Sequence, residues 1–126
     1  MGYTTTFEGA FTLSKPLTEV QAKELFVYAS KRHDNEPGCP GVWCNWKPLR
    51  DSRDKWRKLA WNGAEKFYDY VEWLYTLDAE FFSRWGITVT GSVKFQGERP
   101  EERGTISAKN GQFTVKSRKV GYIHKW

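Results

Sequence analysis

Residues 104–118 read GTISAKNGQFTVKSR and hold an Asn-Gly pair between two runs that alternate apolar with polar residues. This pair, Asn110-Gly111, suits a two-residue type I′ turn, because both central positions of that turn need a positive φ. A turn here pairs Ala108 with Phe113 and brings the apolar residues of both runs to one face. Turn chemistry and hydrophobic pattern therefore predict a β-hairpin.

Four other segments have strand-like patterns. Residues 3–14 (YTTTFEGAFTLS) and 87–96 (ITVTGSVKFQ) alternate with a period of two, which is typical of half-buried strands. We expect Pro16 to end the first of them. The tryptophan-rich runs 42–47 and 55–61 predict two more strands, joined by the charged turn PLRDSRD.

Two helices are expected between these strands. Thr18 and Gln21 form a capping box, which predicts a first helix that continues to about Arg32. The resulting element order is βαββαβββ. It predicts a single α+β domain over residues 1–126, with two helices on one face of a largely antiparallel sheet and a C-terminal β-hairpin. A basic tail covers about residues 116–126.

The second helix is predicted over residues 64–85, where apolar residues recur at helical spacing, with Asn62 as N-cap and Gly86 as C-cap. Its apolar stripe should pack in the core, because aromatic residues at this spacing usually do so. The predicted core residues are Phe67, Tyr70, Val71 and Leu74. The opposite side is expected to be a solvated acidic face with Glu65, Asp69 and Glu72.

The net charge of +5 is distributed unevenly along the chain. Residues 47–58 contain six Lys/Arg and two Asp/Glu, whereas residues 64–85 contain two and five. Oppositely charged faces suit a partner interface. The predicted partner-binding residues are the cations of the basic turn and the C-terminal strands: Lys47, Arg50, Arg53, Lys55, Arg57, Lys58, Lys94, Lys109, Lys116 and Arg118. Hydroxyls interleave with the cations of the strands, but the stacking rings expected of a single-strand binder are missing there. Tryptophans beside the basic turn could supply them instead, although at least two of these are expected to pack in the core: Trp43, Trp46, Trp56 and Trp61.

Catalysis and metal binding are not expected. The two cysteines, Cys39 and Cys44, have a CxxxxC spacing that departs from the usual CxxC zinc pairs. His33 lies six residues before the first cysteine, and His124 is far downstream. We find no nucleophile–base pairing and no phosphate-loop spacing. The sequence thus predicts no metal, no cofactor and no enzymatic activity.

Several blocks of the chain resemble a family of small proteins encoded by bacteriophages and prophages. That family shares a Tyr-Thr-Thr start, an aromatic Glu-Lys-Phe-Tyr-Asp-Tyr-Val-Glu-Trp-Leu block and a Trp-Gly segment before a Gly-x-Val-x-x-x-Gly-Glu strand. The similar blocks here are GYTTTFEGAFTLSKPLT (2–18), WCNW (43–46), AWNGAEKFYDYVEWL (60–74) and RWGITVTGSVKFQGE (84–98). The chain departs from the family pattern at Ala64, at Arg84 and in the basic tail after Val115.

The resemblance implies a phage accessory protein rather than a particular chemistry. Such proteins usually act by binding host machinery or antiviral-defence proteins, so we expect a non-catalytic modulator or inhibitor in the cytoplasm of the infected bacterial host. The alternative is a nucleic-acid or nucleotide-ligand binding protein that uses the basic turn 47–58 and the C-terminal strands. A structural virion protein also stays open. No apolar run is long enough for a membrane span, and the pattern leaves the oligomeric state open.

Overall fold

The computed structural model describes residues 4–34, 36–65, 67–117 and 123–125. It is an α+β fold in the expected order, with the first predicted strand divided in two and an additional strand after the hairpin. The elements are β1 (Thr6–Glu8), β2 (Phe11–Leu17), α1 (Glu19–Ala29), β3 (Trp46–Arg50), β4 (Trp56–Trp61), α2 (Tyr70–Leu77), the π-helical turn η1 (Asp78–Phe82), β5 (Val89–Gln96), β6 (Arg103–Lys109), β7 (Gln112–Ser117) and β8 (Ile123–Lys125).

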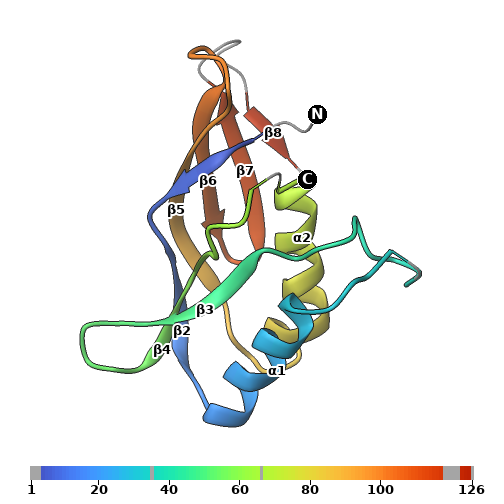
Figure 1. Cartoon of the computed structure of the whole chain (residues 1–126). Coiled ribbons are helices and arrows are strands. Elements are labelled where there is room, and N and C mark those ends of the chain that lie inside the picture. The colour runs from blue at the N-terminus through green and yellow to red at the C-terminus, as the bar shows by residue number, and fades with distance from the viewer. Residues whose placement is uncertain (1–3, 35, 66, 118–122, 126) are drawn as a thin grey trace.

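The strands form one antiparallel sheet in the order β3-β4-β2-β5-β6-β7-β8, and β1 pairs with β5 outside this path. Both helices lie on the same side of the sheet, as Figure 1 shows, with α1 against β3 and α2 against β7. The fully buried side chains Phe11, Trp46, Trp73 and Phe113 belong to the single core cluster. No helix among the described residues is long and apolar enough to cross a membrane.

The predicted hairpin is confirmed in register and in turn geometry. Asn110 and Gly111 have φ values of 52° and 77°, as a type I′ turn requires. Ala108 pairs with Phe113, and both side chains are buried. The Tyr75 hydroxyl of α2 donates to the Phe113 carbonyl at 3.0 Å, which ties the hairpin to the helix.

The segment predicted as one strand, residues 3–14, differs from the prediction in two places. Gly9, with φ of 101°, separates β1 from β2, and Pro16 lies inside β2 instead of ending the strand. The sheet tolerates this proline because the β2–β4 register shifts between Thr12 and Leu17. The Arg57 guanidinium then donates to the carbonyls of residues 13 and 14, which satisfies backbone acceptors at the irregularity.

Helix α1 begins as predicted but ends early. The backbone N–H of Gln21 donates to the Thr18 hydroxyl and that of Thr18 to the Gln21 side chain, completing the capping box. The helix ends at Ala29 rather than at Arg32. Its C-cap residue, Ser30, donates its hydroxyl to a carbonyl of the last turn and thereby closes the helix.

The prediction for the second helix was wrong at its start. Helix α2 begins at Tyr70, because Asp69 is in the left-handed region with φ of 56° and cannot continue a helix upstream. Asn62 accepts from the Ala64 backbone N–H instead of capping a helix. With eight residues, α2 is shorter than α1 and continues directly into η1, where the Ser83 N–H donates to the Asp78 carbonyl.

The structure places Phe67, Val71 and Leu74 in the core, and Tyr70 is partly buried against it. Phe67 reaches the core from the loop before α2 rather than from the helix. Strand β3 also lies later than predicted, at Trp46–Arg50, so residues assigned to the charged turn belong to the strand. Pro48 packs inward there, opposite Leu59, which explains why an apolar residue precedes the charged turn.

Candidate functional site

The outer face of the sheet carries a row of cations on β5, β6 and β7. Lys94 pairs with Thr105, and Thr105 pairs with Lys116, so the three side chains lie on one face. Arg103 is two residues before Thr105 and pairs with Gln96 on that same face. The inward neighbours on these strands, such as Val93 and Ile106, are fully buried. We call Lys94, Arg103, Lys109 and Lys116 the basic sheet face.

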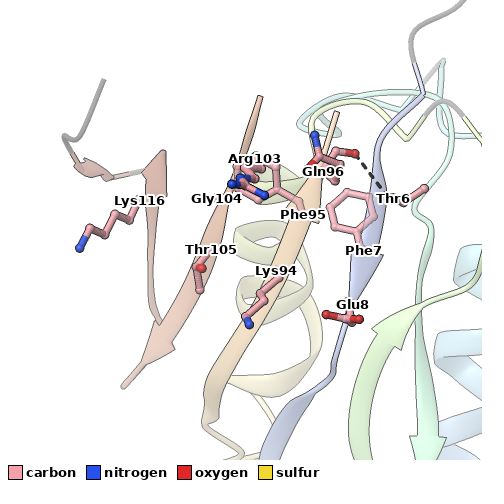
Figure 2. Close-up of a pocket in the computed structure, with 10 residues that line it drawn as sticks. All are labelled: Thr6, Phe7, Glu8, Lys94, Phe95, Gln96, Arg103, Gly104, Thr105 and Lys116. Carbon is pink, nitrogen blue, oxygen red and sulfur yellow. Dashed lines mark hydrogen bonds between the residues drawn. The ribbon is translucent and has the colours of Figure 1, made fainter. Parts of the chain in front are cut away.

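An open groove of about 900 Å³ lies over this face, between β1 and β7. Figure 2 shows Lys94 and Thr105 projecting from neighbouring strands, with Glu8 of β1 beside them. Glu8 pairs with Lys94 across the β1–β5 register and is the acidic residue lining the groove. The groove therefore combines cations, hydroxyls and a single carboxylate with the partly buried rings of Phe7 and Phe95. This lining suits a partner that is mainly anionic and carries some positive groups.

Two further cations lie on the same face of the sheet through its register. Lys58 of β4 pairs with Thr12, and Thr12 pairs with Thr90, four residues before Lys94 on β5. Lys58 donates to the Thr12 hydroxyl at 3.0 Å, which holds its ammonium group over the sheet. Lys47 follows on β3, opposite Ala60. Basic segments far apart in the sequence thus share one surface.

The tip of the basic turn is largely occupied by its own contacts. Arg50 pairs with Asp54 at 2.8 Å and stacks over the Trp56 ring at 4.6 Å, and the Asp54 hydrogen bond raises the pKa of Arg50. The Asp51 carboxylate accepts from the backbone N–H groups of residues 53 and 55, which lowers the pKa of Asp51. This leaves Arg53 and Lys55 as exposed side chains of a separate loop.

The structure therefore divides the predicted partner-binding residues. It brings Lys94 and Lys116 to one groove, places Lys47, Lys58 and Lys109 on the same sheet face, and gives Arg50 and Arg57 structural contacts. Arg118 lies outside the described residues. Arg103 was missed by sequence reasoning, although it continues the outward alternation of Thr105 and Ser107 and could have been found by extending it.

The predicted acidic face is not a helix surface. Glu65 and Asp69 are exposed but precede α2, and only Glu72 lies on the helix. Asp78 and Glu80 follow on η1, where burial raises the pKa of Asp78. Helices α2 and η1 pack on the inner side of the sheet, so their backbone lies across the sheet from the basic sheet face. The Asp78 carboxylate reaches the β6–β7 turn beside Gly111.

A second polar cluster lies in the loop that follows α1. His33 is 1% exposed, and its Nε2–H donates to the Tyr28 carbonyl at 2.7 Å. Its Nδ1 lies 2.6 Å from Oε1 of Glu36. The hydrogen bond from His33, followed by that from Lys31, lowers the pKa of Glu36 to about 2. Cys39 Sγ lies 3.6 Å from the same Glu36 oxygen.

Tyr28 closes this cluster from the helix side. Its hydroxyl lies 3.6 Å from Cys39 Sγ, and burial followed by the hydrogen bond to Cys39 raises the pKa of Tyr28. A cavity of about 470 Å³ adjoins Tyr28, Glu36 and Cys39 and is also lined by residues of α2 and η1. π-Helical turns occur often at functional sites. Cys44 is not one of the clustered ligand residues, although it lies close enough to Cys39 and Tyr28 to act on both electrostatically. It is fully buried, and burial raises its pKa to about 12.

Part of this cluster was considered as a metal site from the sequence and was rejected because of the CxxxxC spacing. His33 and Cys39 were considered as ligands with Cys44, but Glu36, midway between them, was not. The three residues have their ligand atoms within 4.8 Å of one another. Comparisons of the chain with protein-family models, with curated proteins and with solved structures gave no match. Both candidate sites are therefore supported by their geometry alone.

Proposed function

We propose that this protein is a phage-encoded accessory protein that binds and modulates a host or antiviral-defence protein without catalysing a reaction. The observation that carries the proposal is the basic sheet face, with the acidic elements α2 and η1 packed on the other side of the sheet. Such separation orients an approaching partner and accelerates association. The phage setting follows from the sequence resemblance.

A protein partner suits the chemistry of the groove better than a nucleic-acid strand does. The described outward positions of β5, β6 and β7 hold Lys, Arg, Thr, Ser and Gln. The two rings that line the groove, Phe7 and Phe95, are partly buried against the core, where Phe7 meets Trp46 and Phe95 meets Tyr70, so they are not displayed for base stacking. Glu8, which pairs with Lys94, would repel a phosphate but can accept from a lysine, arginine or backbone N–H of a protein. An acidic protein surface with a few basic groups is therefore the expected counterpart.

Nucleic acid is the second candidate, and one structural observation favours it. Helices α2 and η1, which carry Glu72, Asp78 and Glu80, lie on the other side of the sheet, so they would repel a strand lying across the basic sheet face only weakly. Three cations, Lys94, Arg103 and Lys116, line the groove and could contact successive phosphates. Salt dependence distinguishes the two candidates, because phosphate contacts release condensed counterions.

The test compares two triple alanine variants that remove the same charge. The first removes the groove cations Lys94, Arg103 and Lys116. The matched control removes three exposed cations outside the groove, Lys23, Arg53 and Lys55. After nuclease treatment of a host lysate, the wild type and the control should retain the same protein partner and the first variant should lose it. Binding of that purified partner is then measured at 50 and 200 mM salt.

For a protein partner we expect salt to slow association while much of the affinity remains. Three phosphate contacts would instead give a log–log salt slope of about −2.7 and an affinity loss of about 40-fold over this range. Loss of all bound material after nuclease treatment, together with that slope on purified DNA or RNA, would overturn the proposal and establish the nucleic-acid alternative. Equal binding by both triple variants would exclude the groove.

A further inference from the structure

The loop after α1 brings together three side chains that are metal ligands in proteins. His33, Glu36 and Cys39 are spaced by two residues each, and their ligand atoms lie within 4.8 Å of one another. They represent three donor types, an imidazole nitrogen, a carboxylate oxygen and a thiol sulfur, all of which zinc accepts. We propose that these residues bind a zinc ion, although the cysteine spacing of the sequence argued against a metal.

The hydrogen bonds of His33 prepare one ring nitrogen for a cation. The Tyr28 carbonyl can only accept, so Nε2 must carry a proton to make the 2.7 Å contact. The 2.6 Å hydrogen bond between Nδ1 and Glu36 Oε1 places a proton between these two atoms. A metal ion that displaces this proton would meet a ring nitrogen and a carboxylate oxygen that already point at each other. A backbone carbonyl that fixes the far nitrogen is also the usual support of a zinc-bound histidine.

One of the three distances between ligand atoms already matches an edge of a tetrahedral zinc site, and the other two need a small adjustment. The imidazole nitrogen and the sulfur lie within 4.8 Å of each other, where a tetrahedral edge is about 3.6 Å. With bonds of about 2.3 Å to sulfur and 2.0 Å to oxygen, the sulfur–oxygen edge of such a site is about 3.5 Å. Cys39 Sγ and Glu36 Oε1 already lie 3.6 Å apart. The corresponding nitrogen–oxygen edge is about 3.3 Å, so His33 and Glu36 need to separate by only a fraction of an ångström from their present 2.6 Å.

The fourth coordination position would be open to the adjoining cavity. Glu36 and Cys39 both line that space of about 470 Å³, and Tyr28 closes it on the α1 side. A zinc ion with three protein ligands and one exchangeable position accepts water or a small anionic or thiol ligand. The Tyr28 hydroxyl, 3.6 Å from Cys39 Sγ, is placed to donate to the thiolate. The site is thus suited to ligand exchange rather than to purely structural coordination.

Zinc binding must release protons, because the ligands bind in deprotonated form. The thiol of Cys39 loses its proton, and the proton between His33 and Glu36 leaves the pair when the ion takes its place. Affinity should therefore fall as the pH is lowered. No electron transfer is involved, because zinc has no redox chemistry.

The experiment uses the full chain, stripped of metal with a chelator and titrated with zinc by calorimetry at neutral pH. Cobalt(II) serves as a spectroscopic probe, because a tetrahedral site with a thiolate gives a sulfur-to-metal charge-transfer band and intense visible bands. We expect one ion per chain, release of protons into a weak buffer, and a melting temperature that rises with excess zinc.

Two cysteine variants test whether the thiol of the cluster, rather than the buried thiol of Cys44, binds the metal. Cys39→Ser should abolish the charge-transfer band, whereas Cys44→Ala, which removes the buried thiol outside the cluster, should keep it. Glu36→Gln should weaken zinc binding by about tenfold or more. Failure of the wild-type chain to bind zinc at micromolar concentrations would overturn the proposal whatever the variants do. So would a cobalt spectrum that is unchanged in Cys39→Ser.

Discussion

Truncation of Phe67 tests whether the aromatic block before α2 is core or surface. Phe67 is 2% exposed, and its ring meets those of Phe7, Trp46 and Tyr70 at centroid distances of 5.8, 5.4 and 6.2 Å. An aromatic side chain buries roughly 150–250 Å², which at about 25 cal/mol per Å² corresponds to roughly 4–6 kcal/mol as an upper bound. Buried Phe→Ala changes cost about 3–5 kcal/mol, so for Phe67→Ala we expect about 4 kcal/mol.

The free energy of unfolding is measured by urea titration, followed by circular dichroism and tryptophan fluorescence. A chain of this length is stabilised by roughly 6–19 kcal/mol, so the variant should still fold, with a melting temperature lowered by about 10–20 °C. The matched control is the neighbouring Tyr68→Ala, whose side chain is 53% exposed and should cost about 1 kcal/mol or less. A loss below 1 kcal/mol for Phe67→Ala, or a larger loss for the control, would show that the packing described here is wrong.

Three other predictions concern β4, the turn between β6 and β7, and the loop after α1. Arg57→Ala should lower the free energy of unfolding by about 1–3 kcal/mol, because two carbonyls at the β2 irregularity lose their donor; Arg53→Ala should leave it within about 0.5 kcal/mol. Gly111→Ala should cost about 1–2 kcal/mol in urea titrations, because φ of 77° strains an alanine. The lowered pKa of Glu36 contributes stability that is present above its unfolded pKa of about 4.3 and is lost as the pH falls toward about 2. Urea titrations across this pH range should therefore show a smaller decline in the free energy of unfolding for Glu36→Gln than for the wild type. An equal decline in both proteins would contradict this prediction.

Much of the fold could be predicted from sequence patterns that extend over only a few residues. The I′ turn at Asn110-Gly111 and the capping box of Thr18 with Gln21 appear as predicted. Each depends on neighbouring φ values and local hydrogen bonds, which the residues themselves determine. In β5, Val89 and Val93 are buried while Thr90, Ser92 and Lys94 are exposed, because successive side chains of a strand point to opposite faces; the exposed Gly91 interrupts the alternation.

Errors arose where a distant contact decides a local conformation. Pro16 stays within β2 because Arg57, 41 residues downstream, lies across the irregular backbone. Asp69 adopts a left-handed conformation and delays α2 while Phe67 enters a ring cluster with Phe7. Helical spacing upstream of Asp69 could not reveal this, because propensity and periodicity are weaker than tertiary packing.

The same distinction between local sequence pattern and tertiary contact applies to the two candidate sites. The sequence by itself determined that positive charge concentrates in two segments and that a histidine and a cysteine lie six residues apart. Only the tertiary structure decided that Arg103 joins Lys94 and Lys116 across three strands, because cross-strand register is a long-range property. It likewise set His33, Glu36 and Cys39 around one point, because the loop turns back on α1 and the Tyr28 carbonyl orients the imidazole ring.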